Sequence, residues 1–163
     1  MTYPTTLAES LALIGQTSPQ TSATMLTTPI YGDALMFGAD GTIDCPVSQV
    51  FILAQAGGMA GSDNFTISLE QDTVSSFDSG NAKAVTNSAG TAKSAAPSSD
   101  NKQVIINLKA EELDNANGFK YWRYKCLASA DESITFNVAV FGADSRFGPA
   151  SDFDLSTVVA IVK

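Results

Sequence analysis

Short segments in which apolar and polar residues alternate dominate the sequence, and they restrict the chain to folds built from strands. From Asn64 to Glu70 every second residue is bulky and apolar, and the same period recurs at 102–108 and 134–140. This period places one side of each strand in a core and the other in solvent. Segments rich in Ser, Thr, Gly, Asn and Asp separate the strands. We therefore predict an all-β fold, an antiparallel β-sandwich of jelly-roll-like type in a single domain.

The segments between the strands predict which strands are neighbours. Residues 47–55 contain an uninterrupted apolar run, which favours a strand that is covered on both faces. A glycine-rich turn follows and predicts a hairpin with residues 64–70. A second antiparallel hairpin is expected between residues 119–127 and 134–140. The β-sandwich domain would span residues 47–163.

The first 46 residues are expected to form an N-terminal arm. Apolar residues recur at helical spacing from residue 4 to residue 14, which predicts a short helix that ends at Gly15. The remainder of the arm is rich in Thr, Ser and Pro and is expected to be extended, with one or two short strands within residues 25–37. Such an arm needs a surface to lie against, either its own domain or a neighbour.

Residues 71–101 are rich in Ser, Ala, Asp and Asn and poor in apolar residues. We expect a long loop there, with a weak edge strand near 83–87. Loops of this length are uncommon in compact domains and are usually functional or mobile. Two interpretations remain open, a disordered surface excursion and a loop that becomes ordered against a partner.

The absence of histidine and the acidic charge restrict the possible chemistry. Without histidine, Ser-His and Cys-His nucleophile pairs and histidine-based metal sites are excluded. A formal charge of -8 opposes binding to nucleic acid. Acidic pairs such as Asp152 and Asp154 lack the spacing of a calcium loop, and the sequence contains no phosphate loop or nucleophile elbow. We expect a non-enzymatic protein without metal or cofactor, and the only enzyme class that stays open is a carboxylate-based hydrolase.

The cysteines and the N-terminal segment bear on the compartment. Cys45 and Cys126 match no metal-ligand spacing. The N-terminal segment lacks the basic region of a signal peptide, and its apolar run is too short to span a membrane. We therefore expect a soluble protein that is made in a cytoplasm, and two free buried thiols in preference to a disulfide.

The sequence FKYWRYK, residues 119–125, is the densest aromatic cluster of the chain. Basic residues between aromatic rings can mark a surface on which nucleic-acid bases stack. The net charge opposes a phosphate partner, and a tryptophan on a central strand is typical of a sandwich core. We expect Trp122 in the core and the basic residues on the solvent face.

The sequence GADSRFGPASDFDLS, residues 142–156, is the most distinctive segment outside the expected core. Arg146 and Phe147 precede Pro149 in a turn that is expected to be rigid and exposed, and Phe153 follows among aspartates. Exposed arginine and aromatic residues are typical anchors of protein interfaces. The alternative is a surface turn whose phenylalanine packs into the core.

Three segments of the chain resemble one protein family. They are YPTTLAESLALIG near the N-terminus, NLKAEELDNANGFKYWRYK in the middle and GADSRFGPASDFDLSTVVAIV near the end. These segments are similar to small structural proteins of tailed bacteriophages, which are encoded among the virion genes and decorate or cement the capsid. The resemblance covers most of the chain except residues 71–101. It implies a virion protein on the outer capsid surface, made in the bacterial host cytoplasm, bound to the major capsid protein and assembled as a homotrimer.

In a capsid decoration protein of this kind, the N-terminal arm and the end loops would contact the shell. The interface candidates are Tyr3, Pro4, Leu7, Leu11, Arg146, Phe147, Pro149 and Phe153. The alternative function is a receptor- or carbohydrate-binding β-sandwich module of a head fibre or tail. In that alternative, Tyr121 or Trp122 would stack on sugars, so burial of Trp122 would count against it.

Overall fold

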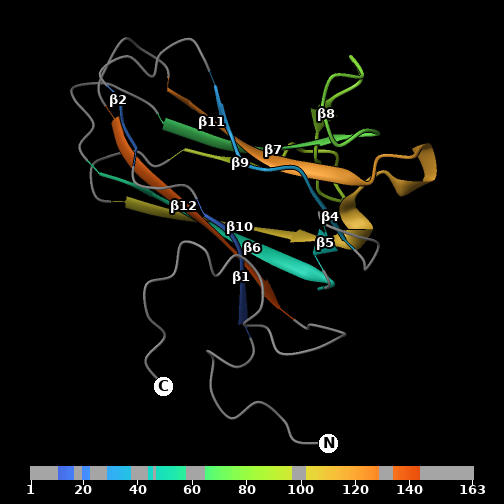
Figure 1. Ribbon diagram of the computed structural model, residues 1–163, viewed down its shortest axis with the longest axis horizontal. Helices are drawn as coiled ribbons and strands as arrows, with labels where there is room; N and C mark the ends of the chain where they lie inside the picture. The colour runs from blue at the N-terminus through green and yellow to red at the C-terminus, as the bar shows by residue number, and fades with distance from the viewer. Residues whose placement is uncertain are drawn as a thin grey trace, which may run out of the picture.

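The chain folds into two β-sheets that face each other across an apolar core (Figure 1). The computed structural model describes residues 11–16, 20–22, 29–37, 44–45, 47–57, 65–96, 102–128 and 134–143. In this part of the chain, the regular elements are strands and two 3₁₀ helices of three residues each. The expected all-β fold is confirmed.

Sheet A is antiparallel throughout. Its strands are β1 (Leu11–Gln16), β2 (Gln20–Ser22), β6 (Gln49–Ala56), β10 (Lys102–Lys109) and β12 (Ile134–Ala143). Their order across the sheet is β1-β12-β6-β10, and β2 also pairs with β12. Strands β12 and β6 therefore lie in the interior of the sheet, and β10 forms one of its edges.

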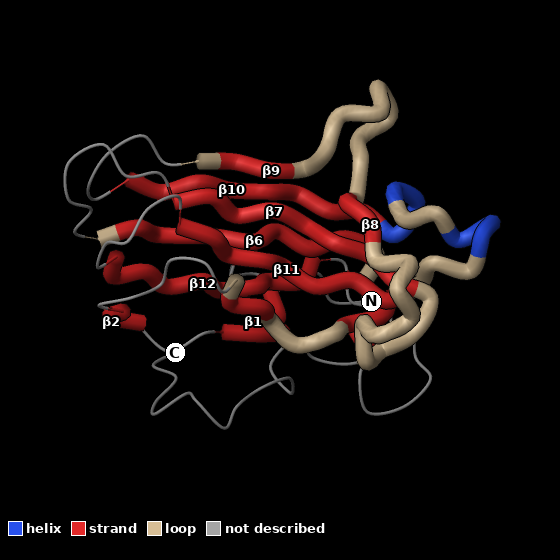
Figure 2. Tube along the Cα trace, turned by 90° about the horizontal axis from the view of Figure 1, so that it is seen from above, coloured by secondary structure: helices blue, strands red, loops and turns tan. Residues whose placement is uncertain are grey.

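Sheet B is built around the long pair β7 and β11. Its strands are β3 (Ile30–Tyr31), β4 (Leu35–Phe37), β5 (Asp44–Cys45), β7 (Phe65–Asp72), β8 (Lys83–Ala84), β9 (Ser94–Ala95) and β11 (Tyr121–Ala128). The order is β5-β4-β11-β7-β8, with β3 paired to β11 and β9 paired to β7. All of these pairs are antiparallel except β4 with β5. The 3₁₀ helices η1 (Ala110–Glu112) and η2 (Asn115–Asn117) connect β10 to β11 and lie at the same end of the molecule as β8 (Figure 2).

The core is formed by the inward side chains of the long strands, because alternate residues of a strand point to opposite faces. Those of sheet A are Val50, Ile52, Ala54, Ala56, Ile106, Leu108, Phe136, Val138 and Val140, and those of sheet B are Phe65, Ile67, Leu69, Trp122, Tyr124, Cys126 and Ala128. The rings of Phe65 and Phe136 meet across the two sheets with their centroids 5.1 Å apart. The alternation predicted for β7, β10 and β12 therefore places the core residues correctly.

Both predicted hairpins are wrong. Strand β6 pairs with β10 and β12 in sheet A, whereas β7 pairs with β11, β8 and β9 in sheet B. In the same way, β11 belongs to sheet B and β12 to sheet A. Each connection crosses from one sheet to the other instead of turning back beside its own strand. The period of two determines which side chains point inward, but an inward face can belong to either sheet.

The helix predicted for residues 4–14 is wrong for its last four residues. Leu11–Gln16 forms strand β1, which pairs with β12. The register shifts between Leu13 and Gly15, so this edge strand contains a bulge. In a helix, the backbone N–H and C=O groups of these residues would bond to each other within the segment. Here they are satisfied by pairing with the long strand β12. Residues 4–10 lie outside the described part, and the short strands expected within residues 25–37 are present as β3 and β4.

The described part of the loop predicted for residues 71–101 is ordered against its own domain. Strands β8 and β9 pair with β7, and Val85 between them is fully buried. The Val85 amide donates to the carbonyl of Leu69 at 2.9 Å, and the Leu69 amide donates to the carbonyl of Lys93 at 3.0 Å. One apolar residue thus anchors a long polar segment on sheet B. The expected edge strand is present as β8.

Candidate functional site

Seven of the eight interface candidates lie outside the described residues. They are Tyr3, Pro4, Leu7, Arg146, Phe147, Pro149 and Phe153, while Leu11 is the first residue of β1. The backbone register nevertheless relates the two segments that contain them. Leu11 is the pairing partner of Ala143, the last residue of β12. Leu11 and Ala143, the described residues nearest to the two terminal segments, therefore lie side by side in sheet A, although they are far apart in the sequence.

The face of sheet A that points away from sheet B is apolar close to this junction. We call outer face A the set Phe51, Leu53, Ile105, Ala139 and Phe141. Phe51 pairs with Phe141 in the register, and their rings are stacked with centroids 5.1 Å apart. Leu53 pairs with both Ala139 and Ile105, and the Ile105 side chain is 64% exposed. Three neighbouring strands thus contribute apolar side chains to one continuous surface.

The edge strand β10 borders outer face A and is partly capped. The Lys93 ammonium donates to the Asn107 carbonyl at 2.5 Å and forms an ion pair with Glu112 at 2.7 Å. The Glu112 carboxylate in turn accepts a hydrogen bond from the Lys109 amide at 2.7 Å. Side chains that satisfy edge groups reduce the tendency of an edge strand to pair with another chain. These contacts protect the Asn107–Lys109 end of β10.

The outer face of sheet B is charged. Glu70 lies between Arg123 at 3.2 Å and Lys125 at 3.0 Å. The Arg123 guanidinium is sandwiched between the rings of Tyr31 and Phe77, 3.7 Å and 4.0 Å from their centroids. Such stacking favours an arginine because its planar group is weakly hydrated. The basic residues of the aromatic strand are therefore engaged within the protein, and Trp122 lies in the core as predicted.

Asp72 holds the segment after β7 against sheet B. It is fully buried, and its Oδ1 accepts hydrogen bonds from the Thr73 amide at 2.6 Å, the Thr73 hydroxyl at 3.3 Å and the Ser79 hydroxyl. Burial alone would raise the pKa of this carboxyl, but the hydrogen bonds from Ser79, Thr73 and Val74 together hold the pKa below its usual value. Phe77, in the same segment, adopts a positive φ of 54°. The residues 73–79 are thus fixed at Asp72 and at Arg123.

Cys126 and Trp122 are interior residues. Cys126 is a free thiol, and its burial raises the pKa to about 12, so the nucleophilic thiolate does not form at neutral pH. Trp122 is fully buried and stacks with Phe37 at a centroid distance of 5.6 Å. It therefore offers no platform to a sugar, and that part of the alternative hypothesis is wrong. Cys45 lies in β5, and its side chain is outside the described part.

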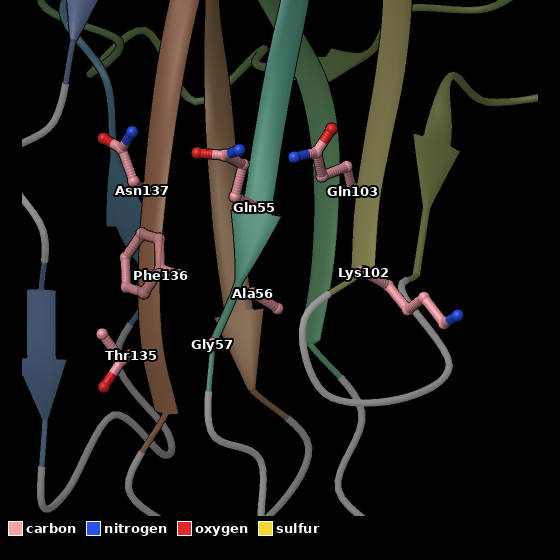
Figure 3. Close-up of a pocket in the computed structure, with 8 residues that line it drawn as sticks. All are labelled: Gln55, Ala56, Gly57, Lys102, Gln103, Thr135, Phe136 and Asn137. Carbon is pink, nitrogen blue, oxygen red and sulfur yellow. The ribbon is translucent and has the colours of Figure 1, made fainter.

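The opposite end of sheet A has a cavity lined by both polar and apolar residues. We call the amide row the residues Gln55, Gln103 and Asn137, which come from β6, β10 and β12 and lie at one level across the three strands (Figure 3). Gln55 pairs with both Gln103 and Asn137 in the backbone register. The cavity has a volume of about 330 Å³. The Oδ1 atom of Asn137 is buried and accepts no hydrogen bond from the described residues.

The described residues contain no group of three or more acidic or cysteine side chains that could hold a metal ion. No helix within the described ranges is long and apolar enough to cross a membrane. What the described residues offer instead are surfaces, namely outer face A and the amide row. Sequence analysis missed both. Their residues occupy the outward positions of alternating strands, and they come together only once the register between distant strands is known.

Comparison with known proteins gives no relative, because no family model, curated protein or solved structure matches the chain.

Proposed function

We propose that this chain is a non-enzymatic structural protein of a phage virion, a capsid decoration protein that binds the outer shell and stabilises the head. Its partner would be the major capsid protein, and it would assemble as a homotrimer on the outer capsid surface. The proposal rests on the resemblance of three sequence segments to such proteins and on one structural observation. That observation is the junction beside outer face A, the pairing of Leu11 with Ala143.

The junction matters because a binding surface needs its anchor residues in one place. The candidate anchors occur before residue 11 and after residue 143, and Leu11 and Ala143 are paired in sheet A. A stable protein interface buries about 800 Å² on each partner and has an apolar centre with a polar rim. The stacked Phe51 and Phe141 and the exposed Ile105 supply such a centre next to the junction.

Outer face A also suits attachment to a large, fixed partner. Ile105 is exposed on a sheet face that also carries two stacked phenylalanines. Such a side chain contributes favourable binding free energy only when a partner surface removes it from water. Burial of one such side chain contributes about 1.5–3 kcal/mol. A shell presents many equivalent copies of one surface, so small contributions at each copy add up to stabilise the head. Two finer features belong to the same proposal, a jelly-roll-like arrangement of the strands and a helical turn within residues 4–10.

Co-sedimentation with capsids that lack this protein tests the proposal. The full-length protein is expected to bind saturably, at a stoichiometry set by the shell lattice. Ile105→Asp places a charge on outer face A at an exposed position, so the variant should fold normally and bind at least about tenfold more weakly. Leu127→Asp is the matched control, because Leu127 is also exposed, at 37%, but belongs to sheet B. Equal shell occupancy for both variants would exclude outer face A from the contact.

The terminal segments require their own variants. We expect Tyr3→Ala with Leu7→Ala, and separately Arg146→Ala with Phe147→Ala, to reduce shell occupancy without changing the melting temperature. Light scattering on the free protein gives the oligomeric state, for which a trimer is expected. A protein that shows no saturable binding to the shell contradicts the capsid assignment as a whole.

A further inference from the structure

We infer that the amide row is a binding site for a neutral saccharide. This inference does not depend on the capsid proposal, because the three amides lie outside outer face A, although the apolar residues beside them, Leu53 and Ile105, belong to it. It rests on four features of the cavity: its three amides, its lack of strong charge, the pairing of its strands and the apolar residues beside it.

The amides of the row are arranged as an array. Gln103, Gln55 and Asn137 lie on three consecutive strands in matched register, and Figure 3 shows their amide groups at the same level. Neighbouring strands lie about 4.8 Å apart, so the row spans about 10 Å. Each amide presents both a donor and an acceptor. A ligand with hydroxyl groups along a length of one or two sugar rings can engage all three.

The charge of the site favours a neutral ligand. Lys102 is the single charged residue among the described residues that line the cavity. It is exposed, and the chain as a whole carries a formal charge of -8. A phosphate or a nucleic acid would be repelled by that charge and would find one cation at the site. Hydroxyl groups carry no charge, so a saccharide avoids this repulsion.

At the centre of the cavity, the paired backbone of β6 argues against a peptide, whereas β10, which carries Gln103, is an edge strand. Extended peptides usually bind by adding a strand to a free sheet edge, where main-chain groups are unpaired. Strand β6 is paired on both sides, with β10 and β12, and β12 is paired with β6 on one side and with β2 on the other. At Gln55 the side chain therefore supplies the hydrogen-bonding groups. Side-chain amides on the face of a sheet suit hydroxyls better than a peptide backbone.

An apolar ledge adjoins the row. The next outward residues on β6 and β10 are Leu53 and Ile105, which pair with each other, and Ile105 is 64% exposed. Ligand sites combine apolar surface with a few placed polar groups. A sugar ring has hydroxyls around its rim and C–H groups on its faces, so it can contact the amides and the ledge together.

The test is an NMR titration of the full-length protein, labelled with ¹⁵N, in which the side-chain NH₂ signals of the row are followed. The probes are glucose, galactose, mannose, N-acetylglucosamine, N-acetylgalactosamine and the β1-4 disaccharides of glucose and N-acetylglucosamine. Each is added up to about 50 mM, well above the dissociation constant of about 1 mM that weak specific binding gives. We expect at least one probe to shift the signals of Gln55, Gln103 and Asn137 saturably.

Single alanine variants identify the site. Gln55→Ala, Gln103→Ala and Asn137→Ala should each weaken binding by about threefold to tenfold, the effect of one hydrogen bond. Asn107→Ala is the matched control, since Asn107 is an exposed amide on the outward side of β10, two rows away. Asn137→Ala should also melt at the same or a higher temperature, because it removes the unpaired buried oxygen.

Each result decides the matter. Saturable shifts that the three variants weaken and Asn107→Ala does not would establish the site. The inference is overturned if no probe shifts the row at 50 mM, or if the Asn107 control weakens binding as much as the row variants. It is also overturned if an uncharged peptide such as Ser-Gly-Ser-Gly shifts the row and no saccharide does.

Discussion

Replacement of Asp72 by alanine should detach the segment 73–79 from sheet B while leaving the sandwich folded. Oδ1 of Asp72 accepts the hydrogen bonds from Thr73 and Ser79, and Phe77 in the same segment stacks on Arg123. Without the carboxylate, the hydrogen bonds from Thr73 and Ser79 are lost, and the stacking of Phe77 on Arg123 is weakened with them. The core strands on either side keep their own pairing and side-chain packing.

The magnitude follows from the contacts of the two carboxylate oxygens. Three hydrogen bonds to a charged acceptor contribute about 1.5 kcal/mol each at the lower end of the range, which applies because Thr73 and Ser79 are half-buried and can turn to water. That gives about 4.5 kcal/mol. The alanine also removes Oδ2, a buried oxygen without a partner in the described residues, which returns about 2 kcal/mol. The net loss is about 2.5 kcal/mol, equivalent to about 5–10 °C in melting temperature for a chain of this length.

Urea unfolding and hydrogen exchange measure this effect. Asp72→Ala should lower the free energy of unfolding at pH 7 and increase amide exchange at 73–79 more than in the core strands. Asp78→Ala is the matched control, because Asp78 lies in the same segment, is exposed and accepts a hydrogen bond only from Ser76 among the described residues, at 2.5 Å. That control should change stability by no more than about 0.5 kcal/mol. Equal effects of the two variants would refute the role of Asp72.

The pH dependence provides a second check. The pKa of Asp72 in the folded protein lies below the usual value of 3.8, so the stabilisation is fully present above that value. It is lost as the pH falls through the folded-state pKa, where the carboxylate becomes protonated. The difference in stability between the native protein and Asp72→Ala should therefore be constant from pH 7 to pH 5 and shrink below pH 3.8. A difference that grows on acidification would contradict the argument.

Three further predictions concern the core. Gly32→Ala should destabilise the protein by about 1–3 kcal/mol in urea, since a Cβ there would lie 2.2 Å from the buried ring of Tyr124, and unchanged stability would contradict this packing. In a Cys45→Ser background, Cys126 should react with a thiol reagent at pH 8 only as fast as the protein unfolds, because its pKa is raised to about 12. Fast labelling of the native protein would refute that burial. The fluorescence of Trp122, the single tryptophan, should resist acrylamide quenching until the protein is unfolded, and ready quenching would place the ring at the surface.

The sequence contained enough to assign inward and outward positions. In β7 the alternation of Phe65, Ile67 and Leu69 with polar residues matches the burial of those three side chains. The same holds for Phe136 and Val138 in β12. The hydrophobic effect acts on each strand by itself, so a period of two is sufficient to identify the buried face.

The partners of each strand could not be derived in the same way. A connection between two alternating strands can fold back within one sheet or cross to the other, and both arrangements bury the same residues. The connections after β6 and β11 cross, so the predicted hairpins failed. Residues 11–16 failed for a related reason, because pairing with β12 outweighs a local helical spacing.

Both candidate surfaces depend on this missing information, and their positions on sheet A make them separable. Along β12, Asn137 of the amide row and Phe141 of outer face A are four residues apart, about 13 Å at the rise of a strand. Along β10, Gln103 belongs to the row, and Ile105 of outer face A lies only two residues away. A shell that binds the Phe51 and Phe141 end would therefore leave Gln55 and Asn137 at the margin of the contact. Asn137→Ala should then bind capsids normally and bind saccharide about threefold to tenfold more weakly. A capsid defect in that variant would show that one surface performs both tasks.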